Sequence, residues 1–446
     1  PEVGSVQVVG NTFKELKDEI AKIVPKSIEY KVDLEAGNIA IVTPVPEKFG
    51  GGEGLVGKIA KKVKRKIKIR PDPSIVKPEL EAKSIIESII PEEAEISQIY
   101  FDGCFSEVII QCQNPGDAVG RRGANVNEIR NKTGWIPKVE RTPPIFSKSV
   151  HDVRSYRNSI SDERKKLLKD FGLNIHRPKR PSSTWVRVTA LGSYREVGRA
   201  CHLVTTNESR VMIDVGVNIA SDTDPMPYFT APEALPLEKL DAVVLTHSHL
   251  DHAGMLPVLF KYGYRGPVYC TPPTRDLMLL LQTDYIKVGG AEGKRPAYDM
   301  EDIRTCMKHV VDVDWGETTD ITPDVKLTFS NAGHILGSSA VHLHVADGKH
   351  NIVFSGDQKY EKSWLFDAAN TRFPKVETLV IESTYGASGD YQPSRQEANQ
   401  ELQDIVMRTI QRGGKMICPV FAVGRSQEVM IAIDELFRSG VVKPVP

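Results

Sequence analysis

The stretch VVLTHSHLDHAGMLP, residues 243–257, places three histidines and one aspartate within six consecutive positions. The whole chain of 446 residues has only 11 histidines. The run AVVL before the cluster is continuously apolar, as in a strand that is buried on both faces. The run AGMLPVLF after it indicates the start of a helix. The cluster therefore falls where a buried strand turns into a helix, so its side chains can converge.

Imidazole and carboxylate groups at this spacing predict a metal site. In such a turn, His247 and His249 could point to one side and Asp251 with His252 to the other, which would divide the ligands between two metal ions. These ligand types suit zinc, and none of the six cysteines forms the CxxC pair of a thiolate site. Further candidates follow other expected strands, each beside glycine or serine: Asp214, His334, Asp357 and Glu382.

A repeat with a spacing of 66 residues occupies the N-terminal part of the chain. Pro25 and Pro91 each end an amphipathic helix pattern, and two strand-like runs follow each proline. The motifs GLVG (residues 54–57) and GRRG (residues 120–123) then each open another helix, and a last strand closes each copy. A single GxxG motif usually marks only a turn, but two such motifs at matched positions of a repeat are a stronger signal of a shared function.

This order resembles a prokaryotic-type KH domain, present twice. The resemblance implies RNA binding, because a KH fold clamps about four nucleotides at its GxxG turn. The second copy is the better clamp, since arginines fill its variable positions, whereas the first is expected to act mainly as a platform. Its basic run KIAKKVKRKIKIR still favours phosphate contact. The predicted RNA contacts are Gly120, Arg121, Arg122, Gly123, Lys61, Lys62 and Arg425.

The C-terminal part carries a second resemblance. The pattern HxHxDH, followed by single histidine and aspartate residues at strand ends, resembles the metallo-β-lactamase superfamily. The motifs ESTYG and PVFAVGRSQEV resemble its β-CASP branch of nucleic-acid-processing members. With two KH units in front, the chain is similar to the archaeal homologues of the cleavage and polyadenylation specificity factor endonuclease. The implied fold is multidomain, α/β and α+β, with two tandem KH domains before an αββα core and the start of a β-CASP insert.

The expected domain boundaries follow from these motifs. Residues 143–183 are rich in basic residues, and a structural spacer and an RNA-contacting arm are equally compatible with them. The run KMICPVFA, residues 415–422, predicts a strand between two helices. The predicted segments are 1–72 and 73–142 for the KH domains, 143–183 for the linker, 184–386 for the hydrolase core and 387–446 for a partial β-CASP domain.

The superfamily resemblance also implies roles for individual residues. One zinc ion would be held by His247, His249 and His334, and the other by Asp251 and His252, with Asp357 bridging the two. Among the catalytic residues Asp214, Asp251 and Glu382, the first would orient a histidine ligand and the last would support a later catalytic histidine. Two zinc ions ~3.5–4 Å apart would activate a water molecule and clamp the scissile phosphate.

The activity implied is that of a zinc-dependent ribonuclease. It would cleave single-stranded RNA, mainly as an endonuclease with 5′–3′ exonuclease action as an option, in transcript 3′-end processing or transcription termination. The family has two further histidine motifs, but no histidine follows His350 in this chain. We therefore expect a C-terminally truncated, impaired form that holds one or two zinc ions, against two in the complete protein.

Two other functions share parts of this pattern. Hydrolysis of a small ester or thioester would use the same metals but would leave the KH repeat unexplained. A non-catalytic RNA-binding scaffold would keep the fold without the chemistry. The expected partners are single-stranded RNA, the transcription machinery and a second copy bound through a segment beyond residue 446. Neither a signal peptide nor an apolar run of ~20 residues is present, so we expect a cytoplasmic protein with no membrane partner.

Charge is distributed unevenly along the chain. Lys and Arg outnumber Asp and Glu by 32 to 25 in residues 1–180, whereas they number 26 against 33 in residues 181–446. A basic first part suits a polyanion such as RNA, and an acidic second part suits cations.

Overall fold

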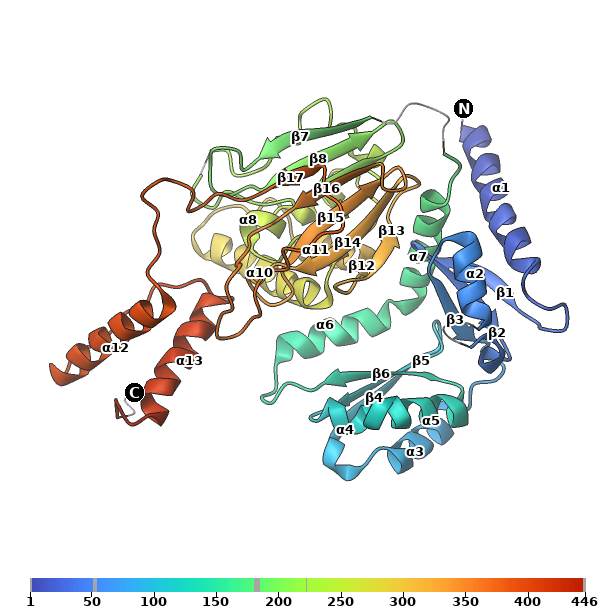
Figure 1. The fold of residues 1–446 in the computed structure, drawn as a ribbon, viewed down its shortest axis with the longest axis horizontal. Coiled ribbons are helices and arrows are strands. Elements are labelled where there is room, and N and C mark those ends of the chain that lie inside the picture. The colour runs from blue at the N-terminus through green and yellow to red at the C-terminus, as the bar shows by residue number, and fades with distance from the viewer. Residues whose placement is uncertain (1, 51–53, 180–184, 222, 444–446) are drawn as a thin grey trace.

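The structure is a computed structural model that describes residues 2–50, 54–179, 185–221 and 223–443, with side chains from residue 12 onward. Residues 51–53 directly before GLVG, the predicted boundary at residues 183 and 184, and residues 444–446 lie outside the described residues. The chain forms two small α+β units, a helical pair, a two-sheet core and a final helical unit, in that order (Figure 1).

The first unit folds around a three-stranded sheet in the order β1-β2-β3, antiparallel and then parallel. Ile20, Ile39, Ile41, Phe49 and Ile59 form its buried core. The GLVG motif does not form a separate turn: its second residue is already the first residue of α2. The elements are α1 (Glu2–Ala21), β1 (Lys31–Glu35), β2 (Asn38–Thr43), η1 (Pro46–Phe49), α2 (Leu55–Val63) and β3 (Ile67–Pro71).

The second unit repeats this topology, with sheet order β4-β5-β6. Its GRRG motif does form a turn between two helices. Gly120 and Gly123 have φ values of 76° and 77° and Arg122 has 54°, the left-handed region in which glycine is least strained. The elements are α3 (Glu79–Ile89), η2 (Glu92–Ala94), β4 (Ile96–Asp102), β5 (Glu107–Cys112), α4 (Pro115–Val119), η3 (Arg121–Gly123), α5 (Ala124–Thr133) and β6 (Ile136–Arg141).

A buried arginine joins the two units. Arg70, at the end of β3, donates through Nε and Nη2 to the carboxylate of Glu35 at 2.8 and 2.7 Å. Its Nη1 donates to Glu107 at the start of β5. All three residues are buried, so the guanidinium from the first sheet is neutralised by Glu35 of its own sheet and by Glu107 of the second sheet.

The linker is a pair of helices, α6 (Lys148–Ser159) and α7 (Ser161–Ile175). The backbone carbonyl of Leu168 accepts from the backbone N–H of Ala36 in the first unit at 2.8 Å. On the other side, the buried guanidinium of Arg164 donates to the carbonyls of Lys308 and Val310 at 3.0 and 2.9 Å. These contacts on two sides support the spacer interpretation over a free RNA-contacting arm.

The core consists of two mixed sheets that face each other. The first has the order β12-β11-β10-β9-β8-β7 and the second β13-β14-β15-β16-β17. Val244 and Tyr269 of the first sheet pack with Leu327, Val341 and Phe354 of the second. The strands are β7 (Val186–Gly192), β8 (Cys201–Thr206), β9 (Arg210–Ile213), β10 (Ala242–Val244), β11 (Val268–Cys270), β12 (Val310–Asp312), β13 (Thr318–Asp320), β14 (Val325–Asn331), β15 (Ser339–Val345), β16 (His350–Phe354) and β17 (Thr378–Val380).

Four helices cover the outer face of the first sheet, where they bury the largest apolar cluster of the chain. Strands β9, β10 and β11 run parallel, and so do β16 and β17. Polar residues that follow β9, β10 and β16 can therefore meet at one edge of the core. The helices are α8 (Leu250–Ala253), α9 (Leu256–Lys261), α10 (Pro272–Ala291) and α11 (Met300–His309), and one 3-10 turn, η4 (Leu237–Lys239), precedes β10.

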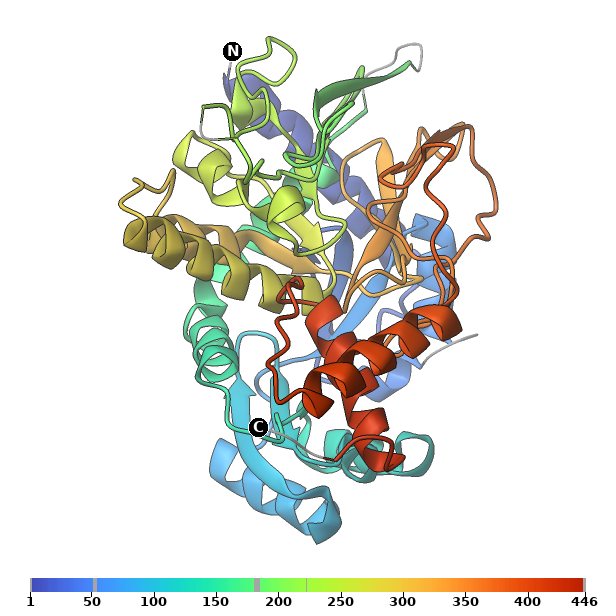
Figure 2. The ribbon, with the colours of Figure 1, turned by 90° about the vertical axis from the view of Figure 1, so that its left-hand side faces the viewer.

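The last unit contains α12 (Arg395–Gln411) and α13 (Arg425–Arg438), which pack on each other away from the two sheets (Figures 1 and 2). The prediction of a strand over residues 415–422 is wrong, because no strand forms there. Ile417 within it is 89% exposed. No strand among the described residues lies beside this run to accept its backbone hydrogen bonds, which explains the difference.

Candidate metal centre

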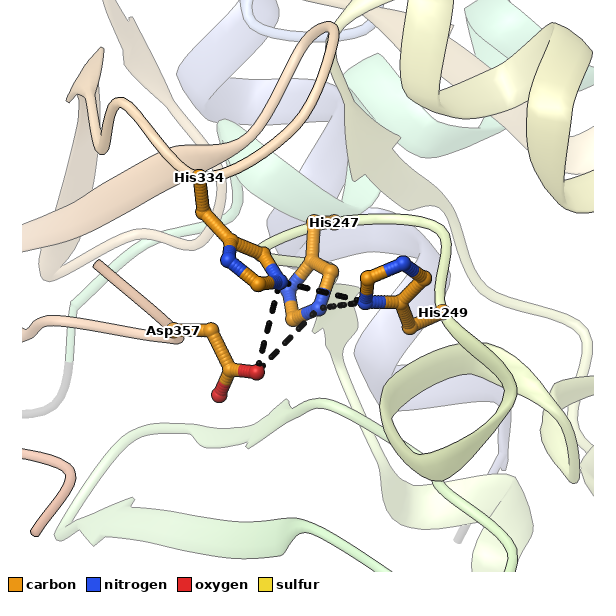
Figure 3. A group of neighbouring side chains, drawn as sticks. All are labelled: His247, His249, His334 and Asp357. Carbon is orange, nitrogen blue, oxygen red and sulfur yellow. Dashed lines mark hydrogen bonds and ion pairs between the residues drawn. The ribbon is translucent and has the colours of Figure 1, made fainter. Parts of the chain in front are cut away.

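Three predicted ligands from two segments converge on one point with a carboxylate (Figure 3). The Nδ1 atom of His249 lies 3.2 Å from Nε2 of His247 and 3.1 Å from Nε2 of His334. The Oδ2 atom of Asp357 lies 3.4 Å from Nε2 of His334 and 3.9 Å from Nε2 of His247. All four ligand atoms fall within 4.8 Å of one another, so one cation could bind all of them.

A second group forms next to the first and shares His247 with it. It consists of His247, Asp251 and His252, with ligand atoms again within 4.8 Å of one another. Asp357 lies between the groups, since its Oδ1 is 3.1 Å from Nε2 of His252 while its Oδ2 faces His334. The structure thus brings together all six predicted metal ligands, although His247 is not confined to one group as the sequence suggested.

Asp214 orients His252, a member of the second group, through a hydrogen bond. Its Oδ2 accepts from Nδ1 of His252 at 2.8 Å and from the Thr246 hydroxyl at 2.8 Å. Its Oδ1 accepts from the Thr246 backbone N–H at 2.7 Å. Because Nδ1 of His252 is occupied, its Nε2 is left to face Asp357. This is how carboxylates generally fix histidine ligands.

Burial keeps three of the imidazoles neutral. It is the main cause that lowers the pKa of His247 well below its ordinary value, lowers that of His249, and lowers that of His334 to about 4. Burial would also lower the pKa of His252, but the carboxylates of Asp357, Asp214 and Asp251 raise it well above its usual value. Neutral imidazole is the form that binds metals, so the first group is prepared for a cation.

The donor set fits zinc. Four imidazole nitrogens and the carboxylates of Asp251 and Asp357 are borderline and hard ligands, and within the described residues no cysteine joins either group. Exposure increases across the centre, from 0% for the His247 side chain and 10% for His252 to 29% for Asp357 and 33% for Asp251. The carboxylates therefore form the open side, from which a substrate could reach the metals.

The other predicted residues lie outside this centre. The carboxylate of Glu382 accepts from the Thr384 backbone N–H at 3.0 Å and belongs to neither metal group, so its catalytic role stays a prediction. Arg425 is half-exposed at the start of α13. Lys61 and Lys62 are exposed on α2, where Lys62 pairs with Glu19 at 3.3 Å. Arg121 and Arg122 are exposed in the second KH-like unit, at the far end of the molecule from β7 and β8 (Figures 1 and 2).

Sequence reasoning missed two residues that contact the centre, Thr246 and Val423, and one lysine close to it in the chain, Lys359. Thr246 holds Asp214 and its hydroxyl lies 3.0 Å from Nδ1 of His247, and its position directly before the cluster could have indicated this. Lys359 follows Asp357 by two residues, and burial and then the Arg425 charge lower the pKa of its ammonium group. The Val423 carbonyl lies 3.3 Å from Nε2 of His249, a contact across 174 residues that no local pattern could reveal.

Comparison with known proteins identifies both halves of this arrangement. Residues 10–76 match the family model of the KH domain of transcription termination factor FttA, and residues 194–402 match that of the metallo-beta-lactamase superfamily. Transcription termination factor FttA of Methanosarcina mazei is 49% identical over 98% of this chain and 69% of its own length. The chain belongs to the FttA family.

Two further members of the FttA family are similarly close. The proteins of Methanothermobacter thermautotrophicus and Thermococcus kodakarensis are 46% and 45% identical over 98% of this chain, which spans 69% and 68% of their lengths. The predicted KH and metallo-β-lactamase architecture and the archaeal family are thereby confirmed. The domain boundaries and the truncation stay predictions.

The superfamily match makes the C-terminal part a hydrolase domain. The N-terminal KH domain brings the capacity for RNA binding. Among the helices of the described residues, none is long and apolar enough to cross a membrane.

Proposed function

We propose that this protein is a zinc-dependent ribonuclease that cleaves single-stranded RNA, mainly endonucleolytically, during transcription termination or transcript 3′-end processing. The convergence of His247, His249, His334 and Asp357 on one point is the observation that carries the proposal. The attached KH domain and the name of the relatives, transcription termination factor, support RNA as the substrate and the transcription machinery as a partner. The same proposal includes that the protein acts in the cytoplasm and that two copies of it form a homodimer.

Some residues of the centre would bind the metal ions, and others orient those ligands. Zinc, when bound, would supply a Lewis acid that polarises the phosphodiester and lowers the pKa of a water molecule, so that this water can release a proton to solvent and attack as hydroxide. Asp357 directs one oxygen to each metal group, and Asp214 fixes the ring of His252 so that its Nε2 faces inward. Asp251 and Asp357 lie on the open side and would hold the attacking group next to the scissile phosphate.

Two cations beside the centre suit the phosphates that flank the cleavage point. Arg425 begins α13, directly after Gly424. Gly424 packs so closely against Ile335, the residue after His334, that a Cβ on Gly424 would lie 2.7 Å from the Ile335 side chain. Lys359 hydrogen bonds through its backbone N–H to the Ala332 carbonyl at 2.8 Å, on the other side of the same loop. The pKa of its ammonium group is lowered by burial and by Arg425, a repulsion that a bound phosphate would relieve.

A cleavage assay tests the proposed activity. The Asp251→Ala variant is expected to lose RNA cleavage by at least ~10²-fold, because it removes a carboxylate ligand from the open side of the centre, where its side chain is 33% exposed. Single-stranded RNA incubated with each protein and zinc provides the measurement, and Asp284→Ala, at an exposed carboxylate on α10, provides the control. Equal cleavage by the unmodified protein and Asp251→Ala would show that this centre does not act on RNA.

A second assay tests the role of the GRRG turn. Replacing both Arg121 and Arg122 with alanine is expected to weaken RNA binding and to reduce the slope of log K against log [salt] by about 1.4, since each lost contact to single-stranded RNA contributes about 0.7. The matched Lys61→Ala, Lys62→Ala variant is expected to change the slope less, because Lys62 already pairs with Glu19. Fluorescence anisotropy over a salt series gives both slopes, and an unchanged slope for the arginine variant would rule out the clamp.

Zinc analysis separates the enzyme from its main alternative. A non-catalytic RNA-binding scaffold would bind RNA through the same KH units but would need no metal. The proposed enzyme should lose RNA cleavage, but not RNA binding, after treatment with a chelator. Cleavage that survives complete removal of zinc would contradict the proposal.

A further inference from the structure

One candidate zinc ligand is held by the final helical unit of the chain. Nε2 of His249 lies 3.3 Å from the backbone carbonyl of Val423, two residues before α13. A carbonyl only accepts hydrogen bonds, so Nε2 must carry the ring proton. The lone pair of Nδ1 then faces His247 and His334, at 3.2 and 3.1 Å. The tautomer that can bind a metal at this position is thus selected by a contact from outside the hydrolase core.

The segment that supplies this carbonyl is fixed to α13. Gly424 donates its backbone N–H to the side chain of Gln427 at 2.7 Å. The side chains of Ser426 and Gln427 donate to the Ala422 carbonyl at 2.8 and 2.9 Å. Residues 421–424 therefore move with α13 as one piece.

Residues 421–424 also pack directly against the metal centre. The Phe421 ring lies 5.9 Å from the His249 ring between centroids, although 74% of Phe421 is exposed. Gly424 has φ of 94°, and a Cβ there would lie 2.7 Å from Cγ2 of the buried Ile335. Only glycine at this position allows the backbone to approach the loop that carries His334 so closely.

We propose that residues 421–424 are the positioning segment of the metal centre. By its carbonyl, Val423 fixes the orientation and tautomer of His249, and Gly424 allows α13 to dock against the His334 loop. The docking of the final helical unit therefore sets how tightly the centre holds zinc. This inference rests on the proposed zinc-dependent function and adds that the metal affinity is controlled from the C-terminal unit.

Zinc affinity tests the inference without relying on RNA cleavage. Gly424→Ala is expected to weaken zinc binding about 10- to 100-fold, the usual effect of losing a group that orients a metal ligand. Gly413→Ala is the matched control, because Gly413 also has a positive φ of 64° but a Cβ there would meet nothing within 4 Å. Competition with a chromophoric chelator gives the affinities. The absorption of bound cobalt(II), which reports ligand geometry, should change in Gly424→Ala only.

A second variant guards against a folding defect at Gly424. Phe421→Ala removes an exposed side chain that contacts His249, so it leaves the fold intact and is expected to weaken zinc binding in the same direction. If the folded variants at both positions bind zinc as tightly as Gly413→Ala, the inference is wrong and the proposed function stands. If the unmodified protein itself binds no zinc, the proposed function fails and the inference fails with it.

Discussion

Replacing Asp357 with alanine is expected to remove at least one zinc ion per chain and to lower RNA cleavage about 10³-fold or more. This carboxylate directs one oxygen toward each half of the centre, 3.1 Å from Nε2 of His252 and 3.4 Å from Nε2 of His334. Its loss removes a ligand and one of the three carboxylates that raise the pKa of the buried His252. Several kcal/mol of transition-state stabilisation by a metal correspond to roughly this factor in rate.

Metal analysis of the purified variant and a cleavage assay with single-stranded RNA measure the two effects. Asp367→Ala is the matched control, because this aspartate is 83% exposed ten residues further along the chain and pairs only with Lys362 at 3.3 Å. It should retain the zinc content and the rate of the unmodified protein. Full zinc content together with full cleavage in Asp357→Ala would mean that the carboxylate does not bridge the two groups.

Replacing Arg70 with methionine is expected to lower the free energy of unfolding of the N-terminal part by about 3–5 kcal/mol. The guanidinium is buried between the sheets of the two KH-like units, where it pairs with Glu35 and Glu107. Methionine keeps most of the volume but removes the buried guanidinium from two buried carboxylates, which retain only the more exposed Lys68 and Lys138 as partners. Urea titration gives the change, and the transition that involves the N-terminal units should move to lower denaturant.

Lys68→Met is the control for this effect. Lys68 also faces Glu35, at 3.5 Å, but its side chain is 38% exposed, so its removal should cost less than about 1 kcal/mol.

Burial alone would raise the pKa of Glu35, but the hydrogen bonds and charge of Arg70 lower it below 4.5. A carboxyl with a lowered pKa stabilises the fold above pH 4.5, and this stabilisation is lost as the pH falls through the folded value. The loss in free energy of unfolding caused by Arg70→Met should therefore be complete at pH 7 and become smaller in acid. A deficit as small as that of Lys68→Met at pH 7 would contradict the account.

Much of the metal centre could be predicted from the sequence because its ligands follow strands. His247 and His249 lie in the loop after β10, and Asp251 and His252 lie in the short helix α8 that follows it, so chain connectivity alone keeps them together. Asp214 and Asp357 follow β9 and β16, and such strand-end residues tend to meet at one sheet edge. The superfamily resemblance then assigned them to a common site, and the structure brings them together.

What could not be predicted depends on contacts between distant segments. Nothing near His249 indicates that its partner is a backbone carbonyl 174 residues away, because any residue type at 423 supplies one. Arg70 ends a basic run that suggested phosphate contact, whereas burial between two sheets commits this arginine to a structural ion pair. The apolar run at residues 415–422 suggested a strand, but a strand forms only where a neighbouring strand accepts its hydrogen bonds.

The most direct test of the account is a crystallographic anomalous difference map collected at the zinc edge from crystals of the zinc-loaded protein. We predict a peak bounded by Nε2 of His247, Nδ1 of His249 and Nε2 of His334, with a second site, where occupied, beside Asp251 and His252 across Asp357. A map without a peak among these side chains, from protein that cleaves RNA, would contradict the central claim.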